Sequence, residues 1–190
     1  MIETPAFTFD PSGHVYRLGD IEIPSVTRIL DTVGLISSYS KDPVAAERGT
    51  DIHLAAKYLF QGILDWSTVS MEIMPYVVSI DRWLEATGYV ANSCEGSDWH
   101  KTLLYAGSWD TEGLIPKHGN TIIDLKSGVP ARWHRWQLAG YKGLVGRGKK
   151  AGSLYAQKDG SMAKFVSHND PVYWQQFISA LNVYRMLEES

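Results

Sequence analysis

Alternating apolar and polar positions in the middle of the chain predict two β-strands between residues 104 and 128. A tight turn at residues 117–120 joins them, because Lys-His-Gly-Asn contains residue types that favour turns. Successive side chains of a strand point to opposite faces, so Asp124 and Lys126 share one face while the apolar residues beside them share the other. The pattern therefore places an acid next to a base in the second strand.

Helical and strand patterns surround these two strands. The clearest helix start is Asp42 followed by Pro43, an N-cap with proline at the first helical position, and Gly62 marks the end of that helix. We expect one α/β domain over residues 1–190, with a hairpin and helices in residues 1–88 and the catalytic sheet with flanking helices in residues 89–190. Predicted helices cover residues 26–33, 42–61, 68–87, 131–146 and a segment from Asp170, and predicted strands lie in residues 6–23, 89–95 and 151–168.

Length and composition agree with this picture. A chain of 190 residues is long enough for one substantial core, and its seven tryptophans argue against disorder. The single Cys94 excludes a disulfide framework within the chain and any Cys-rich zinc or iron–sulfur site. The start of the sequence has no signal-peptide pattern, and no apolar run is long enough to span a membrane. A soluble protein of a reducing compartment is expected.

Charge is unevenly distributed along the chain. The net charge is -3, yet residues 116–150 contain eight basic residues and one acid, so this segment carries +7 and the remainder -10. Such a segment is typical of a face that follows nucleic-acid phosphates, although a solvated helix face with scattered lysines gives the same count. The basic residues are Lys117, Lys126, Arg132, Arg135, Lys142, Arg147, Lys149 and Lys150.

A second carboxylate, Asp110, lies in the first of the two central strands. Charges within apolar strands are costly unless they are paired or bind a metal. A divalent cation is the simplest explanation for Asp110, Asp124 and Lys126 in neighbouring strands.

Asp110, a spacer and then Asp124-Leu125-Lys126 resemble the signature of the PD-(D/E)XK nucleases. Four further pieces, in the same order, are similar to the RecB-like branch that includes phage and mitochondrial genome-maintenance exonucleases. These are Pro-Ser-Val-Thr-Arg-Ile-Leu at residues 24–30, Arg-Gly-Thr-Asp-Ile-His at residues 48–53, the acid Glu95, and the Gln137-x-x-x-Tyr141 motif. The resemblance implies a restriction-endonuclease-like core, a central mixed β-sheet flanked by helices. Some relatives carry a four-cysteine iron–sulfur cluster, which this chain cannot form.

The resemblance also implies a metal site. Asp110 and Asp124, with the backbone carbonyl of Leu125, would hold Mg2+ or Mn2+, since hard cations prefer oxygen ligands. Lys126 would orient or deprotonate the attacking water. His53 maps onto the motif histidine and would serve a second metal or fix the first; by itself, one histidine on a helix is more often structural. One or two ions are both compatible with the sequence.

Two acids have open roles. Glu95 is either a support of the metal site or a surface acid, and Glu112, two residues after Asp110, is a competing ligand.

Contacts with nucleic acid are expected on the predicted helix 131–146. Trp133, Gln137 and Tyr141 recur every four residues and share one face. In the resembled family the Gln and Tyr contact the substrate backbone, whereas Trp133 and Trp136 either stack on bases or lie in the core. The predicted DNA-binding residues are Arg48, Ser127, Arg132, Arg135, Tyr141 and Lys142, with an ion pair to Asp51 as the alternative for Arg48.

Together these observations lead to the hypothesis of a metal-dependent exonuclease acting on DNA ends. The resemblance suggests phage or prokaryotic recombination, replication or repair in the cytoplasm of a bacterial or phage-infected cell, with DNA and a recombination or replication protein as partners. Four alternatives remain: a structure-selective or site-specific endonuclease, a catalytically silent DNA-binding module, a metallohydrolase of small phosphate esters, and an α/β domain with coincidental motifs.

Overall fold

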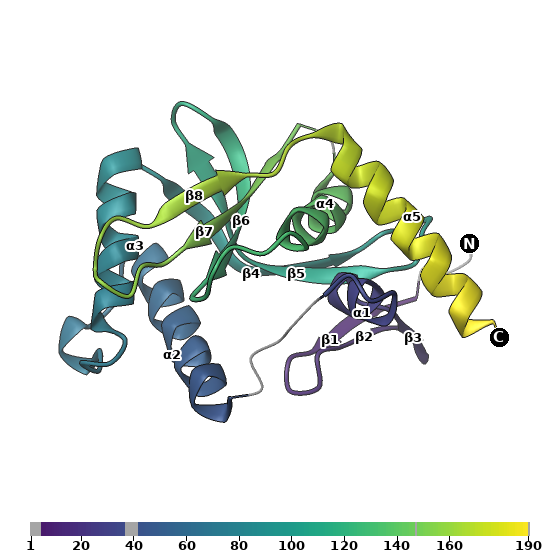
Figure 1. Cartoon of the computed structure of the whole chain (residues 1–190), viewed down its shortest axis with the longest axis horizontal. Coiled ribbons are helices and arrows are strands. Elements are labelled where there is room, and N and C mark those ends of the chain that lie inside the picture. Colours follow the sequence, from purple (N-terminus) through teal and green to yellow (C-terminus); the bar gives the residue numbers. More distant parts are fainter. Residues whose placement is uncertain (1–4, 37–41, 147, 190) are drawn as a thin grey trace.

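The computed structural model describes residues 5–36, 42–146 and 148–189 (Figure 1). Within these ranges a five-stranded sheet has the order β4-β5-β6-β7-β8, and a three-stranded antiparallel sheet has the order β1-β2-β3. The strands of the large sheet are β4 (Val90–Trp99), β5 (Ala106–Ile115), β6 (Gly119–Lys126), β7 (Lys150–Tyr155) and β8 (Lys164–Ser167). Those of the small sheet are β1 (Phe7–Asp10), β2 (Val15–Leu18) and β3 (Ile21–Ile23).

The large sheet is mixed because a helix crosses over between two of its strands. β6 and β7 run parallel, and α4 (His134–Val145) connects them, whereas every other neighbouring pair of this sheet is antiparallel. A parallel pair requires such a crossover, since a tight turn cannot join its ends. The other helices are α1 (Val26–Thr32), α2 (Pro43–Phe60), the short 3-10 helix η1 (Trp66–Thr68), α3 (Met74–Thr87) and α5 (Pro171–Glu188).

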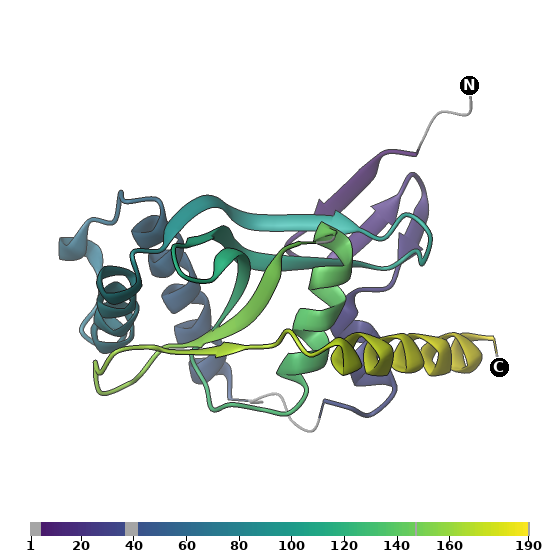
Figure 2. The same ribbon diagram turned by 90° about the horizontal axis from the view of Figure 1, so that it is seen from above.

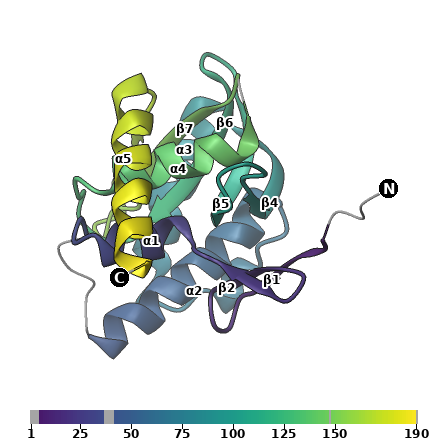
Figure 3. The ribbon, with the colours of Figure 1, turned by 90° about the vertical axis from the view of Figure 1, so that its right-hand side faces the viewer.

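Both faces of the large sheet are covered by helices. Ile122 of β6 belongs to an apolar cluster with Leu138 of α4 and Phe177 of α5, whereas Ile123 belongs to a second cluster with Ile52 of α2 and residues of α3. Figures 1 and 2 place α3 at one end of the molecule and the small sheet and α5 at the other. Figure 3 shows α2 and α5 on different sides of the sheet. The predicted α/β class with a central mixed sheet is confirmed, and this layering agrees with a restriction-endonuclease-like core.

Helix ends follow the local sequence. The Asp42 carboxylate accepts a hydrogen bond from Val44 N–H, and Pro43 begins α2, as predicted. The predicted helix 68–87 was wrong at its start, because α3 begins only at Met74, next to Pro75. Proline lacks an N–H and is tolerated only in the first turn of a helix, so Pro75 marks where the regular part begins.

Other predicted boundaries moved by a few residues. α4 begins at His134 instead of residue 131, and β4 continues to Trp99, past the expected end at residue 95. The small sheet contains a third strand, β3, beyond the expected hairpin. None of the helices in the described part of the chain is both long and apolar enough to cross a membrane.

Two buried histidines connect β7 with its neighbours. The Nδ1 atom of His134 accepts a hydrogen bond from Ala131 N–H and lies 2.7 Å from the hydroxyl oxygen of Tyr155. The Nε2 atom of His168 lies 3.1 Å from Ser153 Oγ. Burial, with a smaller effect of Lys126, lowers the pKa of His134 to about 3, and burial with the charge of Arg135 lowers the pKa of His168 to about 4. Both rings are therefore neutral near neutral pH.

These histidines should make the fold sensitive to acid. Their pKa values lie below the 6.5 of a free imidazole, so the unfolded chain binds more protons once the pH falls below 6.5. Their contribution to stability is complete above pH 6.5 and is lost progressively as the pH falls from 6.5 to about 4 for His168 and to about 3 for His134. In urea titrations, the loss of unfolding free energy from pH 7 to pH 4 should be smaller by roughly 2–4 kcal/mol in the variant His134→Gln/His168→Gln than in the wild type. Parallel pH curves would contradict this expectation.

Candidate active site

Three carboxylates lie near one another on three neighbouring strands. Glu95 of β4 and Asp110 of β5 each lie between paired residues of the two strands, and Asp110 and Asp124 each lie one residue beyond the last pair of β5 with β6. Opposite residues of neighbouring strands have close Cβ atoms, so acids that are distant in sequence come together. The flanking pairs that define this register are Cys94 with Thr111, Gly96 with Trp109, and Thr111 with Ile123.

Asp110 joins β5, β6 and α2 through both of its carboxylate oxygens. Its Oδ1 atom lies 2.7 Å from His53 Nδ1, and its Oδ2 atom accepts a hydrogen bond from Leu125 N–H at 2.5 Å. Burial favours neutral Asp110, but the charge and hydrogen bond of His53 outweigh burial and lower the carboxyl pKa. Burial also favours the neutral form of His53, which acts to lower its pKa. The charge and hydrogen bond of Asp110 outweigh burial and raise that pKa. These opposite shifts of the two pKa values favour the imidazolium–carboxylate form of the pair.

Asp124 and Lys126 form the most buried ion pair of the site. Lys126 Nζ lies 2.5 Å from Asp124 Oδ2, and their side chains are 17% and 9% exposed. Despite this proximity, Asp124 Oδ2 has no hydrogen bond of standard geometry with the described residues. Burial raises the pKa of Asp124; Lys126 opposes this rise and the negative charge of Asp110 adds to it. The predicted sharing of one strand face by Asp124 and Lys126 is confirmed, since Leu125 belongs to the apolar cluster on the other face.

Gln137 on α4 holds Lys126 in place. Its Oε1 atom accepts a hydrogen bond from Lys126 Nζ at 2.9 Å. Its Nε2 atom donates to the hydroxyl of Tyr141 at 2.9 Å and to Thr27 Oγ1 at 3.3 Å. These three contacts fix the orientation of the amide. The ammonium also lies 5.1 Å from the centre of the Trp133 ring, so the side of α4 that carries Trp133, Gln137 and Tyr141 faces the lysine.

Gln137 and Tyr141, which the resemblance assigns to the substrate backbone, are engaged inside the protein. Both side chains are buried, and burial raises the pKa of Tyr141 well above its usual value. They contact each other and Gln137 contacts Lys126, so they form an internal support. Thr27 completes this support. In the sequence, Thr27 lies in a motif of the resembled family and near the start of a predicted helix, and neither feature predicted its contact with Gln137.

The donor atoms suit a hard divalent cation. Asp110 and Asp124 supply carboxylate oxygens on adjacent strands, and Leu125 between them supplies a backbone carbonyl, the ligand types that Mg2+ and Mn2+ prefer. The buried Asp124 oxygen without a regular hydrogen bond fits such a site as well. Within residues 5–36, 42–146 and 148–189, no three His, Cys, Asp or Glu side chains are gathered closely enough to form a complete metal cage.

The two remaining acids have lysine partners. Glu95 Oε2 lies 2.5 Å from Lys57 Nζ, and Glu112 Oε1 lies 2.7 Å from Lys149 Nζ. Glu112 therefore pairs with a lysine that is not part of the group formed by Asp110, Asp124 and Lys126.

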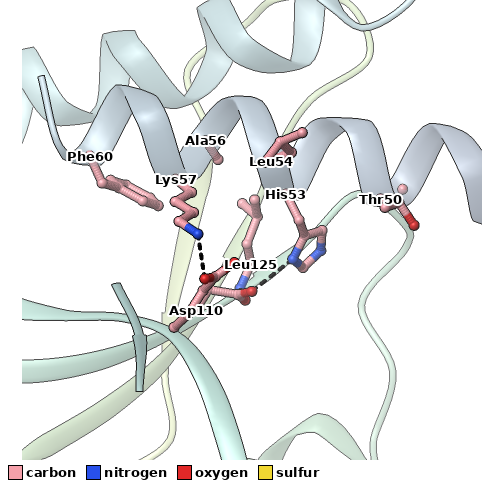
Figure 4. A pocket seen from close by; sticks show the side chains of 10 residues that line it. Thr50, His53, Leu54, Ala56, Lys57, Phe60, Asp110 and Leu125 are labelled. Carbon is pink, nitrogen blue, oxygen red and sulfur yellow. Dashed lines mark hydrogen bonds and ion pairs between the residues drawn. The ribbon is translucent and has the colours of Figure 1, made fainter. Parts of the chain in front are cut away.

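A pocket of about 460 Å3 opens beside Asp110, between α2 and the sheet (Figure 4). His53 and Lys57 extend from α2 toward Asp110 and Leu125, and Thr50 and Phe60 lie on the same helix. The sequence analysis missed Lys57. Its position four residues after His53, and so on the same helix face, was the available signal.

The predicted DNA-binding residues lie on two parts of the molecule. Arg48 of α2 pairs with Glu72 at 3.5 Å, so the alternative pairing with Asp51 was wrong. Ser127 follows β6 and packs against Gly49 of α2.

The other predicted DNA contacts lie on or before α4. Arg132 is exposed just before the helix. Arg135 lies 5.3 Å from the centre of the Tyr173 ring of α5, and Lys142 donates a hydrogen bond to Asn169 Oδ1. Arg147 lies outside the described residues. Trp133 is buried and Trp136 donates a hydrogen bond to Gln176, so both pack against protein.

No family model matches the chain, and no curated protein matches it. Among solved structures, the chain is similar to LHK-Exo in complex with dAMP, with 16% identity, 88% of each chain covered and a TM-score of 0.46. A second structure of this alkaline exonuclease, from Laribacter hongkongensis, shares 16% identity over 87% of this chain and 91% of that chain, with a TM-score of 0.38. A protein of unknown function from Silicibacter pomeroyi shares 17% identity over 63% of this chain and 89% of that chain, with a TM-score of 0.24.

Removal of the Gln137 amide should destabilise the protein. Gln137→Leu leaves Lys126 Nζ, Tyr141 OH and Thr27 Oγ1 without a shared partner, at a cost of about 1–3 kcal/mol in the free energy of unfolding. Urea titration would measure the loss. The matched control is Gln176→Leu, which removes an exposed hydrogen bond to Trp136 and should cost about 0.5 kcal/mol or less. Equal losses in the two variants would show that the buried amide has no special role.

Proposed function

We propose that this protein is a metal-dependent DNA exonuclease that hydrolyses phosphodiester bonds at DNA ends. The observation that carries the proposal is the arrangement of Asp110, Asp124 and Lys126. Two carboxylates lie on adjacent strands, and a lysine beside one of them is oriented by a buried amide. The same three residues form the PD-(D/E)XK pattern in the sequence, so motif and geometry support the same chemistry.

Asp110, Asp124 and the carbonyl of Leu125 would hold the principal Mg2+ or Mn2+. When bound, the ion supplies Lewis acidity, which lowers the pKa of a water molecule and neutralises phosphate charge. His53 keeps Asp110 ionised through their short contact, and an ionised carboxylate is the form that binds a cation. A second ion next to His53 is compatible with the same residues, and Glu95 lines the pocket at its edge.

Lys126 is the residue that we assign to the reacting groups. Its ammonium can orient the attacking water and stabilise negative charge that develops on the phosphate oxygens. Gln137 restricts the directions in which the ammonium can point, and this restriction reduces the reorganisation needed during the reaction. Tyr141 and Thr27 act through Gln137, as positioning residues.

A polymeric substrate is favoured over a small phosphate ester. The +7 segment, residues 116–150, includes α4 and the residues just before it. Among the latter, Arg132 is exposed. Basic residues along one segment neutralise successive phosphates, which a small ester does not offer. DNA ends as the substrate, and a phage or prokaryotic recombination, replication or repair setting with a protein partner from that process, follow from the motif resemblance.

End-labelled linear DNA and covalently closed circular DNA provide the main test. With Mg2+ or Mn2+, the wild type should degrade only the linear substrate, and EDTA should stop the reaction. Lys126→Ala should reduce the rate by about 100-fold or more, because the charge that stabilises the phosphate is lost. Lys158→Ala, in the exposed turn between β7 and β8, is the matched control and should retain activity.

Three outcomes would contradict the proposal in different ways. Cleavage of the circle would assign the protein to the endonucleases. Absence of cleavage of either DNA would make a silent binding module the better account, and full activity of Lys126→Ala would remove the assigned role of this lysine.

Binding to DNA should depend on the basic residues at α4. Reversal of Arg132, Arg135 and Lys142 to Glu should weaken binding and reduce the slope of log K against log salt by about 2–3, since each phosphate contact with duplex contributes about 0.9. The matched control reverses the exposed Lys101, Lys158 and Lys164. An unchanged slope in the first variant, measured by fluorescence anisotropy in EDTA, would exclude phosphate contacts by α4.

A further inference from the structure

Lys57 is a cation at the pocket beside Asp110. The proposed chemistry assigns no role to this lysine. It lies four residues after His53 on α2, and both side chains extend to the same pocket (Figure 4). A hydrogen bond to Glu95 raises the pKa of Lys57, so its ammonium is charged. A charged lysine beside the carboxylates that would hold the metal is within reach of the phosphates that this metal would bind.

The carboxylate that holds Lys57 is displaceable. The Glu95 side chain is 62% exposed, while that of Lys57 is 29% exposed. Exposed ion pairs contribute little, about 0–1 kcal/mol, so another anion can replace the carboxylate at small cost. Glu95 also has a φ of 56°, a left-handed conformation that is uncommon for a residue other than glycine. Such backbone strain occurs often at functional sites, and here it lies in β4 between two residues that pair with the neighbours of Asp110 in β5.

The pocket itself has the properties of a nucleotide subsite. Its volume of about 460 Å3 lies in the range of small-ligand sites, about 300–1,000 Å3. Leu54, Ala56 and Phe60 contribute an apolar part of its lining, and Lys57 and Asp110 contribute charged groups. An apolar wall suits a base, and a lysine next to it suits the phosphate of the same nucleotide.

We infer that Lys57 binds a phosphate of the nucleic acid next to the scissile bond. In the free protein Glu95 pairs with the ammonium of Lys57, and the phosphate displaces this carboxylate. Glu95 thus acts as an internal competitor of the substrate. This inference rests on the proposed function, because it requires nucleic acid to enter the pocket.

The test is equilibrium binding in EDTA, where neither cleavage nor a metal contributes. A short fluorescein-labelled single-stranded oligonucleotide is titrated over a range of KCl concentrations. Lys57→Gln should weaken binding about fivefold and reduce the salt slope by about 0.7, the contribution of one contact with single-stranded DNA. Lys57→Arg retains the charge and should retain the slope, which separates loss of a contact from loss of the fold.

The role of Glu95 is tested by a double-mutant cycle. Glu95→Gln should tighten binding about two- to fivefold in the wild-type background, because it frees the ammonium. The same substitution should have no effect in Lys57→Gln, where no ammonium is present. Glu112→Gln, which removes the carboxylate from the other lysine pair on the neighbouring strand, is the matched control and should not tighten binding.

Several results would overturn the inference. Tightening by Glu95→Gln that persists in Lys57→Gln would mean that Glu95 only repels DNA. An unchanged salt slope in Lys57→Gln, or no binding by the wild type, would exclude the phosphate contact. The proposed function fails separately, through absence of cleavage of linear DNA in Mg2+ by a protein whose binding cycle is intact.

Discussion

Burial of two opposite charges at the end of β6 is the constraint on which the site depends. Asp124 and Lys126 lie on one strand face, and their side chains are almost removed from water. Burying a charge is costly unless partners compensate it, and a pair alone rarely satisfies all of its polar atoms. The surrounding structure supplies a partner for the lysine, since Gln137 accepts a hydrogen bond from it, whereas Asp124 retains an oxygen without a regular hydrogen bond.

The parallel pairing of β6 and β7 explains how Gln137 reaches this pair. A parallel pair needs a crossover element, and α4 begins eight residues after β6 ends. The crossover returns over the face that carries Asp124 and Lys126, and one side of α4 therefore faces the lysine. α2 covers the other side of the sheet and contributes His53 to Asp110. The site thus lies where elements from both faces meet at the end of one strand.

Sequence reasoning predicted the features that depend on short-range rules. Strand alternation placed Asp124 beside Lys126, and the Asp42-Pro43 pattern gave the start of α2. The 3.6-residue period of a helix placed Gln137 and Tyr141 on one face. These predictions held because each rests on local geometry. The start of α3 was placed too early, at residue 68, and the restriction by proline decided the boundary.

The missed features depend on contacts between distant segments. The bond from Gln137 to Thr27 spans 110 residues, and the pair of Lys57 with Glu95 spans 38. No local sequence pattern at either residue predicts its partner, because the fold alone determines which strand lies beside which helix.

The three carboxylates in register share one further property, which follows from their positions. Each has a cationic partner: His53 for Asp110, Lys126 for Asp124 and Lys57 for Glu95. Acids on adjacent strands repel one another, and the pKa of Asp124 is raised in part by the charge of Asp110. The paired cations reduce this repulsion in the free protein, so the sheet can keep its acids together without a metal. Exposure then distinguishes the pairs. The buried Asp124–Lys126 pair is fixed by α4, whereas the exposed Glu95–Lys57 pair is open to exchange of partners with an incoming anion.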